Sequence, residues 1–107
     1  MLNLDVLKEV VGDDPALMKD MLNQFIETTQ ADMQNLQDAL VAANSRDVAS
    51  LAHRIKGSCF VIGASALAEI ADTLEQDGRK DRTTDFPVLS QKVSSAFQDV
   101  RQAIENL

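Results

Sequence analysis

The sequence predicts an all-α protein, an antiparallel up-and-down four-helix bundle with a short N-terminal lid helix. Apolar residues recur at steps of three and four along most of the 107 residues, which is the spacing of amphipathic helices. No stretch alternates between apolar and polar residues with the period of two that is typical of a strand. Because the long amphipathic segments are joined by short connections, each should turn back and pack against the one before it.

The first two predicted helices are bounded by helix-start and helix-stop residues. A short helix is predicted over residues 3–11 and ends at Gly12. Asp14 then suits an N-cap, and Pro15 suits the first helical position. A second, long helix follows, because residues 16–43 contain neither glycine nor proline. The residues predicted to face the core are Met18, Leu22, Phe25, Thr29, Met33, Leu36, Leu40 and Ala43.

The third predicted helix carries the only histidine of the chain, His53. It follows a break at Asn44 and Ser45, either of which can cap it. Gly63 is predicted to end it in the left-handed conformation. Its apolar stripe consists of Val48, Leu51, Ala52, Ile55, Cys59 and Ile62.

Two further helices complete the predicted bundle. The fourth spans residues 65–77 and should end at Gly78,. A polar loop over residues 79–85 leads to a last helix that Asp85 caps and that continues to the end of the chain. The residues predicted to face the core are Leu67, Ile70, Ala71, Leu74, Leu89, Val93, Ala96, Phe97, Val100, Ile104 and Leu107.

Composition and charge restrict the function. Ten basic and seventeen acidic residues give a net charge of −7, which argues against nucleic acid or an anionic membrane as the main partner. Basic residues nevertheless gather between positions 46 and 82, so a locally basic surface around His53 could suit an acidic partner or a phosphoryl group. A single cysteine excludes an internal disulfide. Neither a membrane span nor a signal peptide is evident, so we expect a cytoplasmic domain.

His53 is predicted to face solvent. On a helical projection it lies about 150° from the centre of the apolar stripe. Lys56 and Gly57, three and four residues further on, share its face of the helix. Lys56 would place a cation beside the imidazole, whereas Gly57 leaves the backbone open at a cost of about 1 kcal/mol relative to alanine. Either a partner approaches closely at Gly57, or a neighbouring helix packs there.

The stretch around His53 belongs to an extended motif. It comprises the run from Ala52 to Ser58, followed by Gly63-Ala64, Leu67, Leu74-Glu75 and Gly78-Arg79. This pattern resembles the signature of histidine phosphotransfer (HPt) domains, the intermediates of multistep His-to-Asp phosphorelays, and the resemblance in length and helix layout extends over residues 1–107. It implies that His53 accepts a phosphoryl group from a receiver-domain aspartate and passes it to the receiver of a response regulator. Both a free-standing protein and the C-terminal module of a hybrid sensor kinase of the inner membrane fit it.

The resemblance also implies roles for the neighbours of His53. Lys56 would stabilise the phosphoryl group, and Gly57 would give the receiver room. Arg79 matches the basic residue that closes the motif, and Glu75 stands where some members carry a glutamine that orients the imidazole. Phe60 projects between His53 and Lys56, where an exposed aromatic side chain would suit docking and a partly buried one would only pack.

The expected partners are receiver domains, and we expect a monomer without membrane contact. The sequence shows no obvious metal-binding cluster, and the resemblance implies that the receiver supplies Mg²⁺ from its own acidic pocket. A stand-alone kinase or phosphatase is disfavoured, because the chain has no glycine-rich nucleotide loop and no second histidine. A helical bundle that binds receivers or helices without turnover is the other alternative, and only the complete His-Lys-Gly set weighs against it.

Overall fold

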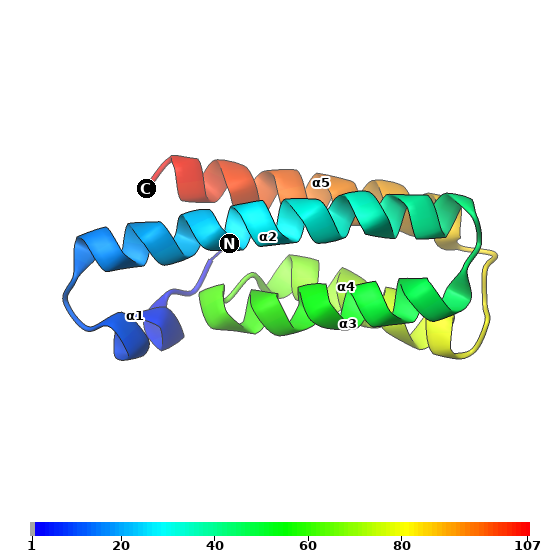
Figure 1. Ribbon diagram of the computed structural model, residues 1–107, viewed down its shortest axis with the longest axis horizontal. Coiled ribbons are helices and arrows are strands. Elements are labelled where there is room, and N and C mark those ends of the chain that lie inside the picture. The colour runs from blue at the N-terminus through cyan, green and yellow to red at the C-terminus, as the bar shows by residue number, and fades with distance from the viewer. Residues whose placement is uncertain (1) are drawn as a thin grey trace.

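The computed structural model describes residues 2–107, which form five helices and no strand. The helices are α1 (Asp5–Val11), α2 (Pro15–Val41), α3 (Ser45–Ile62), α4 (Ser65–Arg79) and α5 (Phe86–Glu105). Figure 1 shows the four long helices side by side, with α1 near one end. The predicted all-α class is confirmed.

The long helix α2 begins as the sequence predicts and ends slightly earlier. Asp14 is its N-cap, and the Asp14 side chain accepts a hydrogen bond of 3.0 Å from the backbone N–H of Leu17. Pro15 occupies the first turn. The helix ends at Val41 rather than Ala43, because the backbone of Ala43 has a positive φ of 52° and leaves the helical region,.

The ends of α3 also match the prediction. The Asn44 side chain accepts a hydrogen bond of 3.2 Å from the backbone N–H of Asp47 and so caps the first turn. At the other end Gly63 adopts the left-handed conformation, with φ 65° and ψ 32°, and its N–H bonds to the carbonyl of Cys59. Only glycine adopts this conformation at little cost. These two caps fix the length of the helix that carries His53.

The prediction that Gly78 ends the fourth helix was wrong. Helix α4 continues through Gly78 and ends at Arg79. Gly78 is buried, and a Cβ atom built there would lie 2.7 Å from the backbone oxygen of Ser45 and 2.8 Å from the backbone nitrogen of Ala49. The glycine therefore permits close packing of α4 on α3 and does not act as a helix terminator.

The core is aliphatic and receives side chains from all five described helices. Helix α3 packs against α4 and α2, and α5 packs against α4 and α2, while α1 contacts α3 and α2. Two residues predicted to face this core do not. Ala43 lies beyond the end of α2, and Leu107 follows the end of α5 and is 73% exposed. The largest fully buried hydrophobic side chains are Leu7, Leu36, Val48, Ile55, Cys59, Ile62, Leu67, Leu74 and Val93.

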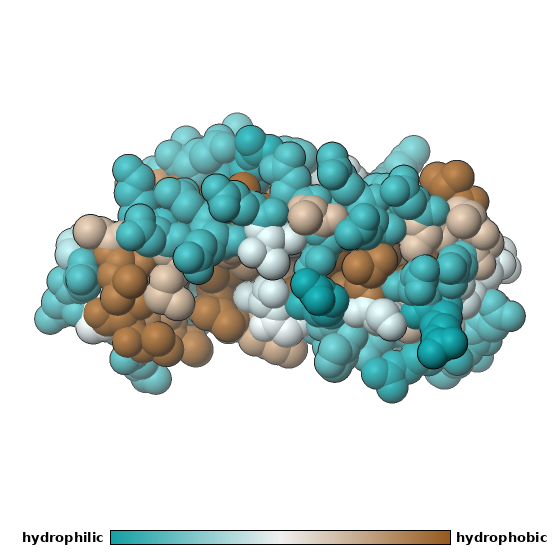
Figure 2. Space-filling model, in the orientation of Figure 1, coloured by the Kyte–Doolittle hydropathy of each residue, from teal (hydrophilic) through white to brown (hydrophobic). Residues whose placement is uncertain are grey.

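The molecular surface is mostly polar. Figure 2 shows hydrophilic residues over most of the visible face and apolar surface at the end that α1 occupies. Val6 and Val10 of α1 are among the large apolar residues left exposed. Within residues 2–107 no helix combines the length and the apolar character needed to cross a membrane.

Candidate functional site

Helix α3 presents His53 to solvent, as its position opposite the apolar stripe predicted. The side chain of His53 is 64% exposed. On the opposite side of the same helix, Ala52, Ile55 and Cys59 are completely buried. Because the buried residues hold α3 against its neighbours, the orientation of the helix, and with it the exposure of the imidazole, is fixed by the core.

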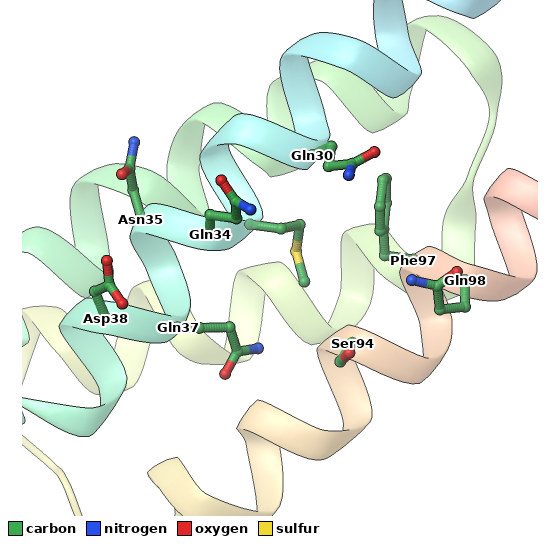
Figure 3. Close-up of a pocket in the computed structure, with 9 residues that line it drawn as sticks. Gln30, Gln34, Asn35, Gln37, Asp38, Ser94, Phe97 and Gln98 are labelled. Atoms are coloured by element: carbon green, nitrogen blue, oxygen red, sulfur yellow. The ribbon is translucent and has the colours of Figure 1, made fainter.

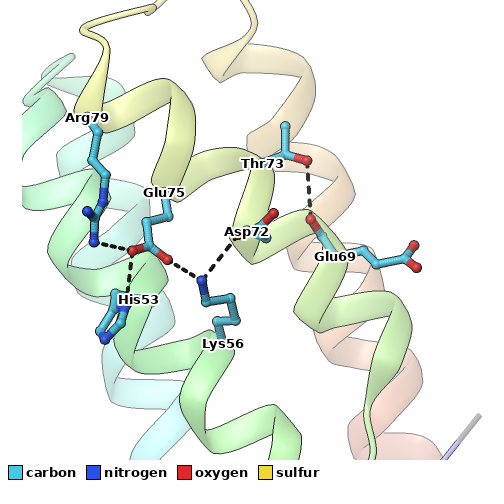
Figure 4. Close-up of polar contacts among 7 residues, drawn as sticks. All are labelled: His53, Lys56, Glu69, Asp72, Thr73, Glu75 and Arg79. Carbon is cyan, nitrogen blue, oxygen red and sulfur yellow. Dashed lines mark hydrogen bonds and ion pairs between the residues drawn. The ribbon is translucent and has the colours of Figure 1, made fainter.

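A buried carboxylate from α4, that of Glu75, lies behind the imidazole. The residue is only 2% exposed. Its Oε2 atom lies 3.0 Å from Nδ1 of His53 and 2.5 Å from Nη2 of Arg79, while its Oε1 atom lies 2.7 Å from Nζ of Lys56. Figure 4 shows the three partners converging on this one carboxylate. The structure therefore joins His53, Lys56, Glu75 and Arg79, four of the predicted site residues, in a single polar network.

The network keeps Glu75 ionised. The Lys56 ammonium is the main cause that lowers the pKa of Glu75 from its usual 4.5 to about 2, and hydrogen bonds from His53 and Arg79 act in the same direction. Burial opposes them, because it disfavours the charged form,. An ionised carboxylate can only accept hydrogen bonds. Nδ1 of His53 must therefore carry the proton that it donates to Glu75, and in the neutral ring the lone pair is on Nε2.

Lys56 is less exposed than the helical projection suggested. Its side chain is 21% exposed, and the ammonium lies 2.7 Å from Glu75 and 3.2 Å from Oδ1 of Asp72. Its bonds to Glu75, and then to Asp72, raise the pKa of Lys56. Lys56 does share the face of α3 that carries His53, as predicted, but the projection of one helix does not show that α4 places Glu75 and Asp72 beside it.

Gly57 and Phe60 lie on the open surface next to this network. A Cβ atom added to Gly57 would meet no other atom within 4 Å. No helix in the described part of the chain packs against Gly57, which removes the packing explanation for this glycine. Phe60 is 64% exposed, so it does not pack into the core either. It lines a shallow groove of about 440 Å³ together with Lys56, Ala68 and others,.

A model of the Hpt domain family matches residues 20–107. The chain belongs to the Hpt family. A solved structure of similar fold is that of histidine-containing phosphotransfer protein B (HptB) from Pseudomonas aeruginosa PAO1, with a TM-score of 0.88 and 26% sequence identity. The match covers 98% of this chain and 91% of the HptB chain. Histidine-containing phosphotransfer in a two-component phosphorelay is therefore the function of this Hpt domain.

Sequence similarity also extends to much longer proteins. The Hpt domain is 34% identical over 64 residues to the virulence sensor protein BvgS of Bordetella bronchiseptica, and equally to that of Bordetella parapertussis. The corresponding protein of Bordetella pertussis is 33% identical over the same length. The aligned segment is 60% of this chain but only 5% of each sensor protein.

Ser58, the last residue of the first run of the motif, and the adjacent Cys59 make contacts within this Hpt domain. The Ser58 hydroxyl donates a hydrogen bond of 3.2 Å to the backbone carbonyl of Arg54, within its own helix. Cys59 is completely buried, and burial raises the pKa of its thiol to about 12. Cys59 is therefore hidden from a partner, whereas Ser58 is partly exposed and its hydroxyl bonds within α3.

Sequence reasoning missed an ion pair that links α2 to the site. Asp32 is buried in α2, and its Oδ2 atom accepts a hydrogen bond of 3.3 Å from Nε of Arg54. Asp32 follows Thr29 by three residues and precedes Leu36 by four, so it lies on the inward stripe. An acidic residue at such a position was the signal that could have identified it, because a buried carboxylate needs a partner.

Basic residues surround His53 on the other side of the network. A surface pocket of about 670 Å³ lies between α3 and α4,. Arg46, Arg54 and Arg79 line it together with His53. This finding agrees with the locally basic surface that the charge distribution predicted. Residues 2–107 contain no group of three or more His, Cys, Asp or Glu side chains that could hold a metal ion.

A second groove lies between α2 and α5 and contains none of the predicted site residues. Its volume is about 540 Å³,. Figure 3 shows that amide side chains of α2 and the Phe97 ring of α5 are among the groups that line it. The residues that line it are Gln30, Met33, Gln34, Asn35, Gln37, Asp38, Ser94, Phe97 and Gln98.

Proposed function

We propose that His53 is the residue on which this Hpt domain carries the phosphoryl group. It accepts the group from the aspartyl phosphate of one receiver domain and passes it to the aspartate of a response-regulator receiver. The observation that carries this proposal is the geometry of the only histidine in the chain. His53 is exposed, and the buried Glu75 carboxylate accepts a hydrogen bond from the protonated Nδ1 atom, so that the lone pair of Nε2 is free to attack phosphorus.

The proposed transfer needs no added base, because every bond, electron pair and proton is accounted for by the two reacting groups. The Nε2 lone pair of His53 attacks phosphorus, so that an N–P bond forms while the bond from phosphorus to the aspartate oxygen breaks. The electron pair of the broken bond leaves with the aspartate carboxylate. Nδ1 keeps its proton, and the positive charge that develops on the ring is stabilised by the ionised Glu75,. Transfer to the second receiver is the same step in reverse.

The neighbours of His53 have separate roles in this proposal. Lys56 and Arg79 hold Glu75 in its ionised form, and both place positive charge close to the phosphoryl group. The ammonium of Lys56 acts as a point charge toward the phosphoryl oxygens. Gly57 and Phe60 serve docking, because one leaves open space and the other offers an exposed aromatic side chain,.

The receiver supplies the Mg²⁺ ion that neutralises charge on the transferring group. Phosphoryl transfer depends on such neutralisation and on alignment of the two reacting groups. We infer that the domain acts as a monomer in the cytoplasm, with receivers and not nucleic acid or membrane as its partners. The likeness to HptB supports a separate phosphotransfer protein, and the likeness to BvgS supports a module of a sensor protein. The same chemistry at His53 serves both arrangements.

We also propose that residues 1–107 form one domain, an antiparallel up-and-down bundle of α2 to α5 with α1 as a lid. The packing of α3 and α5 against both α2 and α4 supports this arrangement. The contacts of α1 with α2 and α3, near one end of the molecule, support the position of the lid.

A labelling experiment tests the proposed function. A panel of receivers carrying radioactive aspartyl phosphate is mixed with the Hpt domain, and the label on the domain is followed in acid and in alkali. We expect an acid-labile, alkali-stable phosphate that is absent from His53→Gln. An acid-stable phosphate, or label retained in His53→Gln, would contradict the proposal. Label taken from ATP without any other protein would instead indicate an autonomous kinase.

A further inference from the structure

Contacts between α3 and α4 follow a regular antiparallel order. The Ser45 hydroxyl donates a hydrogen bond to Asp81, which lies just past the end of α4. One turn along α3, Ala49 lies against Gly78. One further turn brings His53 to Glu75 at 3.0 Å. The contact at Gly78 and the hydrogen bond at His53 are therefore adjacent along both helices.

The contact at Gly78 leaves no room for a side chain. A Cβ atom there would lie 2.7 Å from the backbone oxygen of Ser45, 2.8 Å from the backbone nitrogen of Ala49 and 3.0 Å from the Cβ of Ala49. The two shortest contacts are to backbone atoms, so no change of rotamer could relieve them. A side chain at this position would have to push α4 away from α3.

The required displacement is large compared with the tolerance of the neighbouring hydrogen bond. Restoring an ordinary contact of 3.4 Å from 2.7 Å needs a shift of about 0.7 Å,. The bond from Nδ1 of His53 to Glu75 is 3.0 Å long, and N–H···O bonds in proteins rarely exceed about 3.2 Å. Because α4 is a continuous helix from Glu75 to Gly78, a shift at Gly78 also moves the Glu75 carboxylate away from the imidazole.

We propose that Gly78 is a positioning residue for phosphotransfer: it sets the α3–α4 separation at which Glu75 holds His53 with Nδ1 protonated and Nε2 free. This inference rests on the proposed role of His53. Gly78 touches neither the phosphoryl group nor the imidazole, and it acts through Glu75. The two glycines of the site thus have opposite surroundings, because Gly57 faces open space and Gly78 faces the backbone of α3.

The test is nitrogen NMR of the imidazole in Gly78→Ala. Because His53 is the only histidine, selective ¹⁵N-histidine labelling gives one pair of ring signals, and their shifts report which nitrogen carries the proton. With the ring neutral, we expect Nδ1–H in the unaltered protein and a mixture of tautomers in Gly78→Ala. We also expect the rate of label transfer from a phosphorylated receiver to fall about tenfold, the effect of losing a hydrogen bond to a charged group.

Two controls separate positioning from stability. Gly57→Ala introduces the same side chain where it meets no atom within 4 Å, and it should leave the tautomer unchanged. Val100→Ala removes buried methyl groups from α5, so it should lower the stability and leave the tautomer unchanged. If Gly78→Ala is only partly folded, the substitution is introduced into a stabilised background that also carries Asn23→Ala and Asn35→Ala. These two changes improve helix propensity at exposed positions of α2,.

The outcomes are distinct. An unchanged tautomer in folded Gly78→Ala, with transfer reduced only in proportion to the unfolded fraction, would overturn the proposal. So would a Gly78→Ala variant that stays unfolded in the stabilised background, because the glycine would then serve folding alone. An unaltered protein that takes no label on His53 would overturn the proposed function instead. The tautomer comparison needs no phosphate and would still decide the role of Gly78.

Discussion

At the residue scale, the site depends on one buried carboxylate. Glu75 is almost completely buried, yet it is surrounded by His53, Lys56 and Arg79. A buried charge without partners is costly, whereas a carboxylate with several donors remains ionised at low pH. The same contacts therefore support the fold and set the protonation of the imidazole. Changes at Glu75 and Lys56 should affect stability and chemistry together.

The first prediction concerns Glu75 and pH. The folded protein holds the pKa of Glu75 at about 2, below its usual 4.5. A group with a lowered pKa stabilises the folded state fully above its unfolded pKa, and that contribution is lost as the pH falls through the folded pKa. We expect Glu75→Gln to be less stable than the unaltered protein at pH 7, and the difference to shrink between pH 4.5 and pH 2. Urea unfolding at pH 7, 4 and 3 measures it.

The control for this prediction is Glu69→Gln, the same chemical change on the exposed side of α4. It should be close to the unaltered protein in stability at each pH, because Glu69 lies outside the network. If the stability of Glu75→Gln ran parallel to that of the unaltered protein from pH 7 to pH 3, the network would not keep Glu75 ionised.

The second prediction concerns Lys56. Lys56→Ala removes the cation that does most to lower the pKa of Glu75, so we expect a measurable loss of stability in urea unfolding and a shorter lifetime of the phosphohistidine. Lys19→Ala, an exposed lysine of α2, is the matched control and should change neither quantity. Unchanged stability and lifetime in Lys56→Ala would show that its ammonium contributes to neither the network nor the phosphoryl group.

At the scale of the helix, the site requires one face of α3 to pack against neighbouring helices and the opposite face to remain uncovered. The buried stripe of α3 packs against α2 and α4. On the opposite face, a Cβ atom added to Gly57 would meet no atom of another part of the molecule within 4 Å. A glycine inside a helix costs about 1 kcal/mol relative to alanine. Since no helix in the described structure contacts Gly57, that cost is consistent with room for a partner.

The third prediction is therefore that Gly57→Leu separates folding from docking. Leucine should raise the melting temperature or leave it unchanged, because it improves helix propensity by several tenths of a kcal/mol. Its side chain would stand beside His53 in the path of a receiver, so transfer from a phosphorylated receiver should become much slower. Labelling by a small donor such as phosphoramidate should be nearly as fast as before.

Thermal unfolding and the two labelling rates together check this prediction. A lower melting temperature, with receiver transfer reduced only in proportion to unfolding, would show that Gly57 serves the bundle. Equal slowing of both donors would show that leucine disturbs His53 itself and not the docking of the partner.

Most of the fold follows from local sequence signals. The caps at Asp14, Asn44 and Gly63 were predicted because the side chain or backbone conformation that each supplies acts within one helical turn,. The buried stripes follow from periodicity in the same way. Gly78 was misread, because a glycine near the end of a helix usually marks its C-terminus. Its actual role depends on the distance to another helix, which no local pattern contains.

The candidate site was predictable to a similar extent. The exposure of His53 and the openness around Gly57 follow from the projection of a single helix. The burial of Glu75 and the covering of Lys56 do not, because both result from the register of α4 against α3. The contact between Asp32 and Arg54 was not predictable either, because it depends on how a third helix, α2, packs against α3. Sequence periodicity assigns a face to each residue, but it does not say which residue of another helix lies opposite.

At the scale of the whole molecule, charge is distributed unevenly. The chain carries a net charge of −7, yet Arg46, Arg54 and Arg79 line the pocket beside His53. Charges separated by more than the Debye length of about 8 Å are largely screened at physiological ionic strength. A partner that docks at His53 therefore responds mainly to the charges next to it, which include these three arginines.

The last prediction follows from this distribution. If the receiver approaches with its acidic pocket toward His53, opposite charges should accelerate the encounter, and added salt should slow it. Arg46→Glu reverses one charge of the pocket and touches neither Glu75 nor the core. We expect it to slow receiver transfer at low salt and to make the rate depend less steeply on salt.

Lys19→Glu is the control: it makes the same charge change at the start of α2, outside the pocket, and should leave both the rate and its salt dependence unchanged. Transfer rates measured at limiting receiver concentration between about 20 and 500 mM salt distinguish the two, since the Debye length falls from about 20 Å to about 4 Å over that range. Equal effects of the two substitutions would mean that net charge alone, and not the basic surface beside His53, governs the encounter.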